Sequence, residues 1–437
     1  MKYTFKGGTH VEEHKNTAGC KIEIMEAPEK VSIPLQQHIG APCQPLVKIG
    51  DYVMRGQMIG SVENALGCPV HSSVSGKVIA IDSRNNAQGV PVQNIIIEND
   101  GQMTMSPDIV PLDRDYRELS ADELIEKIRL GGVSGMGGAM FPTYAKIRSA
   151  LGKVDRIIVN CAECEPYITA DCRIMIEQTE RLMTGIRILR HVFGLDRAYI
   201  AVEDNKPESI EAMKREAGDD IEICVCKTKY PQGDERQMMF AITGRKLPPG
   251  KLPADIGCVL FNASSCVAVY NAVVLGMPVI ERVVTVDGDC IANPKNILAP
   301  IGSSYSDLIE FCGGLVKEVK TLVSGGPMMG AAQWDMNGSV IKGTSALLAL
   351  SKDQFRHYDE PSVCIRCGRC VNNCPMHLMP NYLVRYARLG KYEETEKLGI
   401  MACVECGTCS YNCPGHMMIV QHIRVAKGAL RARNIKK

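Results

Sequence analysis

Two cysteine-rich segments near the end of the chain, CIRCGRCVNNCP at residues 364–375 and CVECGTCSYNCP at residues 403–414, decide the fold of the C-terminal region. Each follows the spacing C-x2-C-x2-C-x3-C-P, and together they contain eight of the twenty cysteines of the chain. Cysteines repeated at a fixed spacing indicate ligands of a metal centre, because cysteines used only for packing have no reason to repeat. The C-terminal region is therefore predicted to fold around bound metal.

This spacing is typical of domains that hold two [4Fe-4S] clusters, in which the fourth cysteine of each run ligates the other cluster. The assignment puts Cys364, Cys367, Cys370 and Cys413 around one cluster, and Cys403, Cys406, Cys409 and Cys374 around the second. Structural zinc is the alternative for CxxC pairs, but a zinc site has no use for the third cysteine or for the x3-C-P ending. One-electron transfer is therefore part of the predicted function.

The composition is that of a globular chain with several domains. A length of 437 residues indicates about three or four domains of ~100 to 200 residues each. The hydrophobic content of 45% and the charged content of 23% are ordinary, and the formal net charge of +1 argues against a nucleic-acid partner. Because no run of about 18 apolar residues occurs, we expect no membrane span.

The N-terminal segment MKYTFKGG contains no apolar signal region, so we expect a reducing compartment in which disulfides are rare. The twelve cysteines outside the two motifs are then expected to act as small buried hydrophobic residues. The last stretch, residues 424–437, is locally basic. It is either a solvated end of the chain or a segment that docks on a membrane surface or a partner.

The N-terminal third has the pattern of a β domain. Residues 47–60 alternate apolar and polar side chains around Gly-Asp and Arg-Gly turns, which predicts a hairpin, and residues 69–81 form a second such stretch. Together they resemble the barrel-sandwich hybrid fold of biotinyl and lipoyl carrier domains. Those carriers present a modifiable lysine between the two halves, but the connecting residues 64–68 contain none. We therefore expect a structural or docking module.

A glycine-rich loop follows a predicted helix in the middle of the chain. Residues 124–130 have helical periodicity and lead into GGVSGMGGAMFPT at residues 131–143, with Lys146 close behind. Glycines allow the backbone to approach a phosphate or a planar ring, and successive N–H groups can bind an anion. A plain flexible loop is the alternative, because such a loop is weak evidence by itself.

The next segments indicate a doubly wound α/β domain. Residues 156–160 form a β-branched run typical of a buried parallel strand, residues 173–193 are helix-like, and residues 198–202 form a second strand. In such domains ligands bind beyond the carboxyl ends of the strands, where Asn160, Glu163 and Glu165 are expected. The two carboxylates are either part of a ligand site or solvated loop charges.

Residues 279–314 have the pattern of a small β domain. Residues 283–289 alternate into a turn, and residues 306–314 predict a short helix that ends at two glycines. This region resembles the soluble-ligand-binding β-grasp domain. We expect a packing and spacer domain in preference to a small-molecule site.

The motifs together resemble two related families. GMGGAMFPTYAK at 135–146 and NCAECEP at 160–166 resemble the patterns GRGGAGFPTGLK and NADESEPG of the NADH-binding flavoprotein subunit of respiratory complex I. Six further features, in the right order, resemble the RnfC subunit of the Rnf complex. They are TFKGGTH (4–10), QHIGAPCQPLVKIGD (37–51), YPQGDERQMMFAITGRKLP (230–248), SGGPMMG (324–330), IKGTSALL (341–348) and the doubled cysteine motif.

The resemblance implies a membrane-associated, ion-translocating ferredoxin:NAD+ oxidoreductase, with this chain as its FMN- and NAD(H)-binding subunit. It implies cofactor contacts from Gly135, Gly137, Gly138, Ala139, Phe141, Lys146, Asn160, Glu163, Glu165, Gly233, Asp234, Glu235, Asn262 and Ser264. Phe141 is similar to an aromatic residue that stacks on the NADH adenine, and Glu163 and Glu165 are expected to tune the site electrostatically. Met136, Met140 and Tyr167 depart from the family pattern, which has an arginine and two glycines there.

The implied architecture has six parts. They are an N-terminal arm (1–30), a barrel-sandwich hybrid (31–110), a Rossmann-like FMN/NAD(H) domain (111–276), a β-grasp domain (277–350), a ferredoxin domain with two clusters (351–425) and a basic tail (426–437). The implied partners are the membrane subunits and the iron–sulfur RnfB-type subunit of the complex, with ferredoxin acting indirectly. The chain is expected to be peripheral, at the cytoplasmic face of the membrane.

The implied function is the conversion of two-electron into one-electron transfer, because NADH gives a hydride, each cluster carries one electron and a flavin can exchange both. Two alternatives remain. The chain also resembles an RnfC-like soluble protein that feeds NADH electrons to a reductase such as proline reductase. The other alternative is a non-catalytic relay whose flavin pocket is filled by Met136, Met140 and Tyr167.

Overall fold

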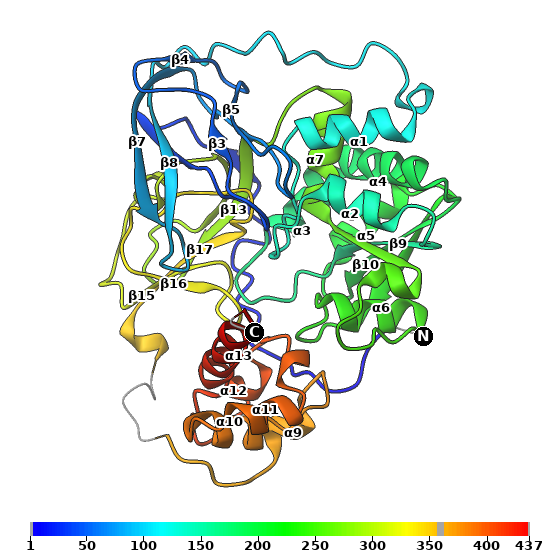
Figure 1. Cartoon of the computed structure of the whole chain (residues 1–437), viewed down its shortest axis with the longest axis vertical. Coiled ribbons are helices and arrows are strands. Elements are labelled where there is room, and N and C mark those ends of the chain that lie inside the picture. Colours follow the sequence, from blue (N-terminus) through cyan, green and yellow to red (C-terminus); the bar gives the residue numbers. More distant parts are fainter. Residues whose placement is uncertain (1–2, 356–361, 436–437) are drawn as a thin grey trace.

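The computed structural model describes residues 3–355 and 362–435 and divides them into the regions shown in Figure 1. Two β-rich regions lie beside a helix-rich α/β domain, and the small helical domain that carries the cysteine motifs lies below them. The N-terminal arm, residues 3–29, passes between these regions before the first domain begins. The arrangement places the cysteine domain next to one end of the α/β domain.

The first domain is built from two small sheets. A four-stranded sheet has the order β2-β8-β7-β4 and a three-stranded sheet the order β3-β5-β6. Alternating side chains such as Val31, Ile33, Ile95 and Ile97 are buried between them. The strands are β2 (Lys30–Pro34), β3 (Gln44–Pro45), β4 (Tyr52–Val53), β5 (Met58–Ser61), β6 (Val70–His71), β7 (Gly76–Asn85) and β8 (Pro91–Asn99).

The predicted hairpins in this domain are wrong. β4 pairs with β7, whereas β5 pairs with β3 and β6, so the two strands of residues 47–60 enter different sheets. β6 and β7 are separated in the same way. The turn itself is present, because the Gln57 N–H donates to the Met54 carbonyl at 3.0 Å. A short alternating stretch predicts a turn, but whether its arms pair with each other is decided by the second sheet.

The α/β domain contains a four-stranded parallel sheet in the order β11-β10-β9-β12. Its strands are β9 (Arg156–Cys161), β10 (Ala198–Glu203), β11 (Ile221–Cys226) and β12 (Cys258–Asn262). The first strand in the chain, β9, lies between the second and the fourth. Chain connections therefore run in opposite directions from β9, which creates a topological switch point between β9 and β12.

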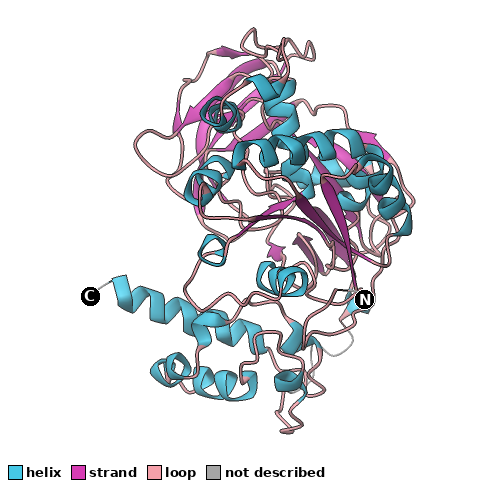
Figure 2. Cartoon of the chain, turned by 90° about the vertical axis from the view of Figure 1, so that its right-hand side faces the viewer, coloured by secondary structure: helices cyan, strands magenta, loops and turns pink. Residues whose placement is uncertain are grey.

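Most helices of this domain cover one face of the sheet, as Figure 2 shows, and α6 covers the other face. The helix predicted over residues 173–193 is in fact two helices, α3 and α4, which are separated at Gln178 with φ −125°. The helices are α1 (Ala121–Leu130), α2 (Thr143–Ala150), α3 (Ala170–Glu177), α4 (Thr179–Phe193), α5 (Pro207–Glu216), α6 (Glu235–Thr243) and α7 (Ala263–Val274), with 3-10 turns η1 (Tyr116–Glu118) and η2 (Pro253–Ile256).

The third region is a mixed six-stranded sheet in the order β1-β14-β13-β17-β15-β16, packed against one short helix. Its first strand comes from the N-terminal arm and pairs in parallel with β14. The predicted short helix is present and is followed by Gly313 and Gly314, both with φ near +85°. The elements are β1 (Ile22–Ile24), β13 (Glu281–Asp287), β14 (Lys295–Pro300), α8 (Tyr305–Phe311), β15 (Thr321–Ser324), β16 (Ala331–Gln333), β17 (Ala346–Leu350) and η3 (Lys352–Gln354).

The cysteine domain has two short helices within the motifs and three longer ones that pack on them. Leu383, Ile400, Ile423 and Ala426 form the centre of its own small core. Among the described residues, no helix has the length and apolar character needed to cross a bilayer. The elements are α9 (Arg369–Asn372), α10 (Pro380–Arg388), α11 (Tyr392–Lys397), η4 (Ile400–Ala402), α12 (Thr408–Tyr411) and α13 (Ile419–Ile435). Lys436 and Lys437 of the basic tail lie outside the described residues.

Candidate functional site

The predicted ligand residues meet at the switch point of the α/β sheet. Asn160 ends β9, Asn262 ends β12, and the two residues are partners in the register of these neighbouring strands. Asn160 donates from Nδ2 to the Gly233 carbonyl at 2.8 Å and accepts the Ala162 N–H at 3.1 Å. The carboxyl ends of β9 and β12 therefore carry three separate loops to one place, as expected for a ligand crevice.

The glycine-rich loop lies over this crevice. It is closed by the Gly135 N–H, which donates to the Phe141 carbonyl at 2.8 Å. A Cβ atom added at Gly137 would stand 3.1 Å from the Asn262 side chain, so the loop approaches the end of β12 closely. Gly138 and Ala139 are exposed to solvent. The loop is thus an open cradle whose floor is Asn262.

Several buried polar atoms around this cradle have no partner among the described residues. They include Oγ of Ser134, Oδ1 of Asn262 and Nη1 of Arg282. Helix α7 begins directly after Asn262, and its first turn receives no side-chain cap. Unsatisfied groups at a helix N-terminus favour a bound anion. The residues present therefore fit a phosphate-bearing group such as FMN.

Asp171 completes the arrangement at the start of α7. Its carboxylate accepts Asn262 Nδ2–H at 2.6 Å and the Ser264 hydroxyl at 2.5 Å. The Met136 N–H donates to the Ser265 hydroxyl at 2.8 Å, and Arg282 donates to the Met136 carbonyl at 2.8 Å. The loop, α3, α7 and β13 are therefore joined through side chains.

The three bulky departures from the family pattern turn away from the crevice. Met136 is buried in the hydrophobic core. Met140 has φ +49°, and its side chain occupies the space that a Cβ of Gly343 would need. Tyr167 has φ +69° and stacks on His14 of the arm, with ring centroids 4.7 Å apart. Two of these residues thus keep a left-handed backbone that favours glycine, while their side chains are accommodated elsewhere.

Glu163 is buried at the N-terminus of α3. Its carboxylate accepts the N–H groups of Asp171 at 2.7 Å and Cys172 at 3.3 Å, so it caps the helix. Burial raises the pKa of Glu163, and the nearby ammonium groups of Lys15 and Lys206 oppose that rise. We conclude that Glu163 fixes the position of α3 and contributes negative charge next to Asp171.

Glu165 is held from two other regions of the chain. Its carboxylate accepts the Met328 N–H at 3.1 Å and lies 3.4 Å from the Tyr230 hydroxyl. A Cβ at Gly326 would clash with this carboxylate. Burial raises the pKa of Glu165 to about 7 despite these contacts. The loop at 325–330 thus contributes to the site, although the sequence predicts only a spacer there.

Lys146 and Phe141 flank the site. Lys146 donates to the Leu260 carbonyl at 3.0 Å, and burial lowers its pKa although Glu235 opposes the change. Phe141 is half-buried at the end of the glycine loop. The Lys146 ammonium therefore lies beneath the crevice, near the end of β12, and not on its open side.

The Gly233–Glu235 turn forms the third wall. A Cβ at Gly233 would stand 2.6 Å from the Ala162 carbonyl, and the Gly233 N–H donates to the Cys164 sulfur at 3.3 Å. Asp234 caps α6 through the N–H groups of Arg236 and Gln237, both at 3.1 Å. Asp234 is thus committed to the helix, which leaves the open edge of this turn to Glu235.

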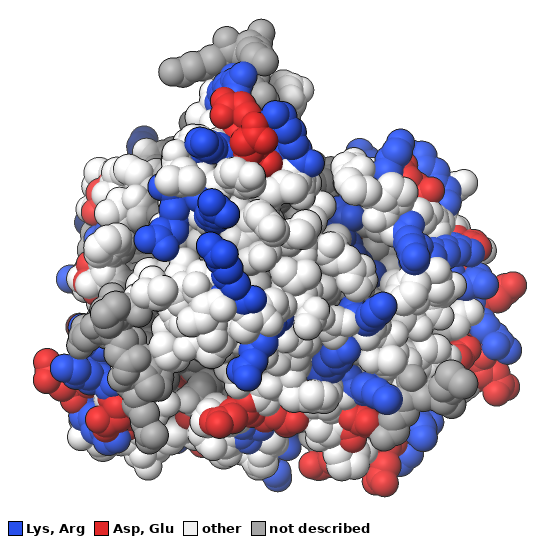
Figure 3. All heavy atoms as spheres, turned by 90° about the horizontal axis from the view of Figure 1, so that it is seen from below, with Lys and Arg blue, Asp and Glu red and all other residues white. Residues whose placement is uncertain are grey.

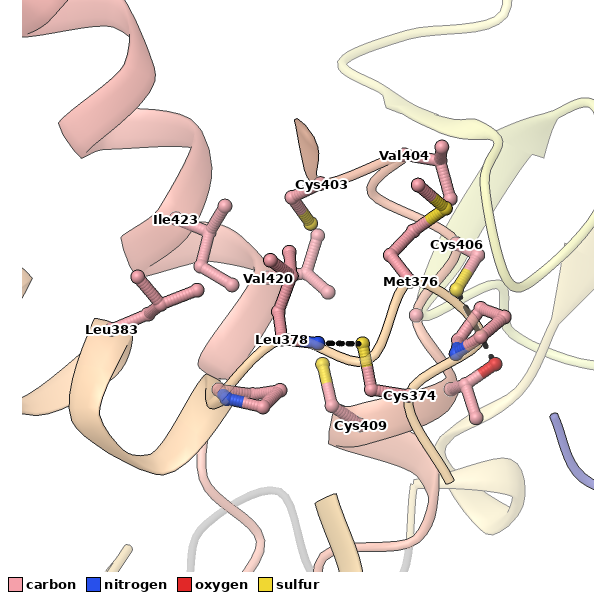
Figure 4. A pocket seen from close by; sticks show the side chains of 14 residues that line it. Cys374, Met376, Leu378, Leu383, Cys403, Val404, Cys406, Cys409, Val420 and Ile423 are labelled. Atoms are coloured by element: carbon pink, nitrogen blue, oxygen red, sulfur yellow. Dashed lines mark hydrogen bonds between the residues drawn. The ribbon is translucent and has the colours of Figure 1, made fainter. Parts of the chain in front are cut away.

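Four of the eight motif cysteines surround one apolar pocket. Figure 4 shows Cys374, Cys403, Cys406 and Cys409 pointing toward one another across it. Two of the sulfurs accept backbone N–H groups at 3.4 Å, from Leu378 to Cys374 and from Glu405 to Cys403. No three His, Cys, Asp or Glu side chains of the described residues converge as they would around a single metal ion. Four thiols around a shared space, with N–H groups directed at sulfur, fit a [4Fe-4S] cluster.

The other four motif cysteines form an equivalent site nearer the surface. Burial raises the pKa of Cys370, and the neighbouring thiols of Cys413 and Cys364 raise it further, so these three lie close together. Cys364 and Cys367 are exposed. Both motifs have left-handed residues at equivalent positions, which are Arg366 and Glu405, Gly368 and Gly407, and His377 and His416. We call the buried site the proximal site and the exposed one the distal site.

The proximal site is joined directly to the crevice. The Tyr230 hydroxyl, next to Glu165, donates to the Cys406 carbonyl at 2.6 Å. Gln237 of α6 donates to the Pro375 carbonyl at 3.2 Å. The crevice, the proximal site and the distal site therefore follow one another toward the surface.

Sequence reasoning missed several residues of this site. Lys15, Cys164 and Tyr230 contact its loops, as do Asp171 and Arg282. The sequence predicts Cys164 to be a packing residue, although its place between two glutamates after a strand is a usable signal. The others carry no local signal because their partners are distant in the sequence.

Family comparisons agree with this architecture. Four domain models match the chain: the RnfC barrel sandwich hybrid domain at residues 3–102, the Nuo51 FMN-binding domain at 128–271, the SLBB domain at 283–332 and the 4Fe-4S dicluster domain at 363–418. A chain of an NAD+-reducing [NiFe]-hydrogenase has a similar fold, with a TM-score of 0.50 and 17% identity over 73% of this chain and 62% of that one.

Whole-length relatives are more similar. The RnfC-type subunit of the proton-translocating ferredoxin:NAD(+) oxidoreductase complex of Clostridium ljungdahlii is 44% identical over 99% of this chain and 95% of its own length. Its counterpart in the Na(+)-translocating complex of Acetobacterium woodii is 42% identical over 99% and 98%. The counterpart in the ion-translocating oxidoreductase complex of Rhodobacter capsulatus is 40% identical over 100% and 85%. The chain therefore belongs to the RnfC family, whose members are subunits of ion-translocating ferredoxin:NAD(+) oxidoreductase complexes.

Proposed function

We propose that this chain exchanges hydride between NAD(H) and FMN and passes single electrons through two [4Fe-4S] clusters to a partner subunit. The observation that carries the proposal is the continuous series of crevice, proximal site and distal site, linked by Tyr230 between Glu165 and the Cys406 carbonyl. A flavin bound in the crevice supplies both two-electron and one-electron chemistry. The chain supplies the binding, orientation and spacing.

The flavin phosphate is assigned to the start of α7. Asn262 and Ser264 lie there, and the uncapped first turn supplies N–H groups. The open loop of Gly135, Gly137, Gly138 and Ala139 approaches this turn and would cover the flavin without side-chain obstruction. Asn160, Glu163, Glu165, Gly233, Asp234 and Glu235 form the remaining wall, Lys146 lies beneath it, and Phe141 flanks the entrance for the adenine.

Acidic side chains favour NAD(H) over NADP(H). Glu163, Glu165 and Glu235 lie on the walls of the crevice, where a 2′-phosphate would meet like charges. The Glu165 carboxylate is fixed by the Met328 N–H and therefore restrains nucleotide and flavin without moving. The chain thus tunes the site by charge and fixed geometry, and it needs no proton transfer from these groups.

The distal site is the proposed point of contact with the partner. Cys364 and Cys367 are exposed, with the basic side chains of Arg366 and Arg369 beside them. Seen from below, the molecule presents basic side chains across its middle (Figure 3). Such a surface favours an acidic redox partner. We assign this contact to an iron–sulfur subunit of the Rnf complex and place the chain peripherally at the cytoplasmic face of the membrane.

The contacts of Met136, Met140 and Tyr167 count against a relay with a filled flavin pocket, since each side chain is accommodated outside the crevice. The test is turnover of the purified, cofactor-loaded chain with NADH and a one-electron acceptor, compared with NADPH. We expect NADH-dependent reduction that NADPH supports poorly. A chain that lacks FMN and ignores NADH would contradict the proposal.

Replacing Glu165 with glutamine is expected to slow flavin reduction by NADH by about tenfold, because it removes a fixed charge from the crevice and disturbs the aligned geometry. The clusters should be unaffected, since Glu165 lies outside their loops. Stopped-flow absorbance measures the rate, and electron paramagnetic resonance checks the clusters. An unchanged rate of NADH oxidation would show that the charge has no such role.

The same carboxylate predicts a pH dependence of stability. Folding raises the pKa of Glu165 from 4.5 to about 7, so the folded chain holds this proton more tightly than the unfolded chain. Between those values, stability from this group falls as pH rises, by up to about 3 kcal/mol. The Gln variant lacks this loss. Anaerobic thermal unfolding at pH 5.5, 6.5 and 8 should show its stability rising relative to wild type with pH, and parallel curves would rule the effect out.

A further inference from the structure

The N-terminal arm connects the carboxylate loop of the crevice to the loops of both cluster sites. We infer that the arm is a positioning element of the electron-transfer site, with Lys15 fixing the loop that carries Glu163 and Glu165 and Gly7–Thr9 fixing the cysteine domain. The inference rests on the proposed function and adds to it residues that lie outside the flavin, nucleotide and cluster motifs. Its basis is a set of contacts at each end of the arm.

Lys15 is enclosed by the loop that it holds. Its ammonium donates to the backbone carbonyls of Glu163 at 2.8 Å, Glu165 at 2.8 Å and Ile168 at 2.5 Å. An ammonium has three N–H donors, so these carbonyls use all of them. Three acceptors converging on one cation fix the path of residues 163–168, which in turn sets the direction of both glutamate side chains.

The neighbouring arm residues follow the same loop. Tyr167 donates its N–H to the Glu13 carbonyl at 2.9 Å. The hydroxyls of Thr17 and Thr169 lie 2.6 Å apart, and Asn296 of β14 donates to the Thr17 carbonyl at 2.9 Å. The arm therefore bridges the carboxylate loop and the β-grasp sheet, and Lys15 is the charged centre of that contact.

The charges around Lys15 explain why a cation is needed there. Glu163 and Glu203 are its acidic neighbours, and Lys206 is a second cation that pairs with Glu203 at 3.0 Å. Removing Lys15 would leave three carbonyls without their donor next to two buried carboxylates. The loop would then have to move or admit water.

The other end of the arm contacts the residues that precede the two exchanged cysteines. The Gly8 N–H donates to the carbonyl of Asn373, which precedes Cys374, at 2.9 Å. The Thr9 hydroxyl lies 3.2 Å from Oδ1 of Asn412, which precedes Cys413. Gly7 has φ +85°, and a Cβ there would stand 2.8 Å from the Cys374 carbonyl. The arm therefore lies against the backbone where the two cluster sites exchange ligands.

The experiment compares Lys15→Met, Lys15→Arg and a matched control in the full chain loaded with FMN and clusters. The control is Arg187→Met, because Arg187 also holds backbone carbonyls, those of Glu216 and Ala217, but at the opposite end of the sheet. Two readouts are used: the flavin midpoint potential from a dithionite titration, which needs no NADH, and the rate of flavin bleaching by NADH.

For Lys15→Met we expect a shifted flavin potential and bleaching slowed by about tenfold or more in kcat, with a smaller change in KM. Lys15→Arg should lie between this variant and wild type, because its planar donors match three convergent carbonyls only in part. Arg187→Met should change neither readout, whatever it does to stability. Wild-type potential and rate in Lys15→Met would overturn the inference for Lys15.

Gly7→Ala tests the other end and stays informative if Lys15→Met does not fold. We expect flavin bleaching at the wild-type rate with slower reduction of the clusters, measured by rapid-freeze electron paramagnetic resonance. Cluster reduction at the wild-type rate in Gly7→Ala would overturn the role of the arm at the cysteine domain. If wild type itself fails to bleach with NADH, the proposed function falls, while the potential of Lys15→Met still decides the inference.

Discussion

Replacing Cys406 with alanine is expected to stop electron flow from NADH to the distal cluster, although NADH still bleaches the flavin. Cys406 is one of four thiols around the proximal pocket, and its carbonyl accepts the Tyr230 hydroxyl beside the crevice. A [4Fe-4S] cluster without one of its four thiolates is lost or damaged. The chain should therefore lose about half of its iron and the step that follows the flavin.

The matched variant is Cys367→Ala at the distal site. It should also remove about half of the iron, but the proximal cluster should still be reduced by NADH, because that site adjoins Tyr230 and Gln237. Iron analysis and electron paramagnetic resonance after NADH addition distinguish the two variants. Reduction of the remaining cluster in Cys406→Ala as fast as in wild type would show that electrons do not need the proximal site.

Replacing Gly137 with valine is expected to weaken FMN binding by about 10- to 100-fold. A Cβ at this position already lies 3.1 Å from the Asn262 side chain, so the two additional methyl groups enter the cradle or displace the end of β12. Overpacking of this kind costs about 1–3 kcal/mol, which corresponds to that range of affinity. FMN retention after desalting and fluorescence titration of the deflavinated protein measure it.

Gly428→Val is the control for Gly137→Val. Gly428 lies on α13, and a Cβ there meets no atom within 4 Å. This variant should retain FMN as wild type does, while both variants keep their clusters. Full FMN occupancy in Gly137→Val would place the flavin away from the glycine loop and would require another site for it.

The cofactor motifs could be predicted from the sequence because their chemistry is local. The cysteine spacing predicts which thiols share a site, and the structure brings Cys374 to the three cysteines of the other motif. The strand at 156–160 and the loop at 135–139 likewise lead to the switch point of the sheet. In each case neighbouring residues carry the signal, so no distant contact has to be known.

The remaining features depend on contacts between distant residues. The sequence predicts that β4 and β5 pair, but each finds a partner in a different sheet. The helix break at Gln178 has no proline or glycine to mark it. Lys15 lies 148 residues before Glu163, and nothing in its own segment indicates that its ammonium closes the carboxylate loop. Tertiary packing decides these features, and local pattern does not.

The central claim is that the chain converts a two-electron donor into single electrons in the order crevice, proximal site, distal site. The most direct measurement is an anaerobic titration of the purified, cofactor-loaded chain with NADH, followed by visible absorbance and electron paramagnetic resonance. We predict bleaching of one flavin per chain, followed by signals from reduced clusters as further NADH is added. A flavin-free chain whose clusters do not respond to NADH would contradict the claim.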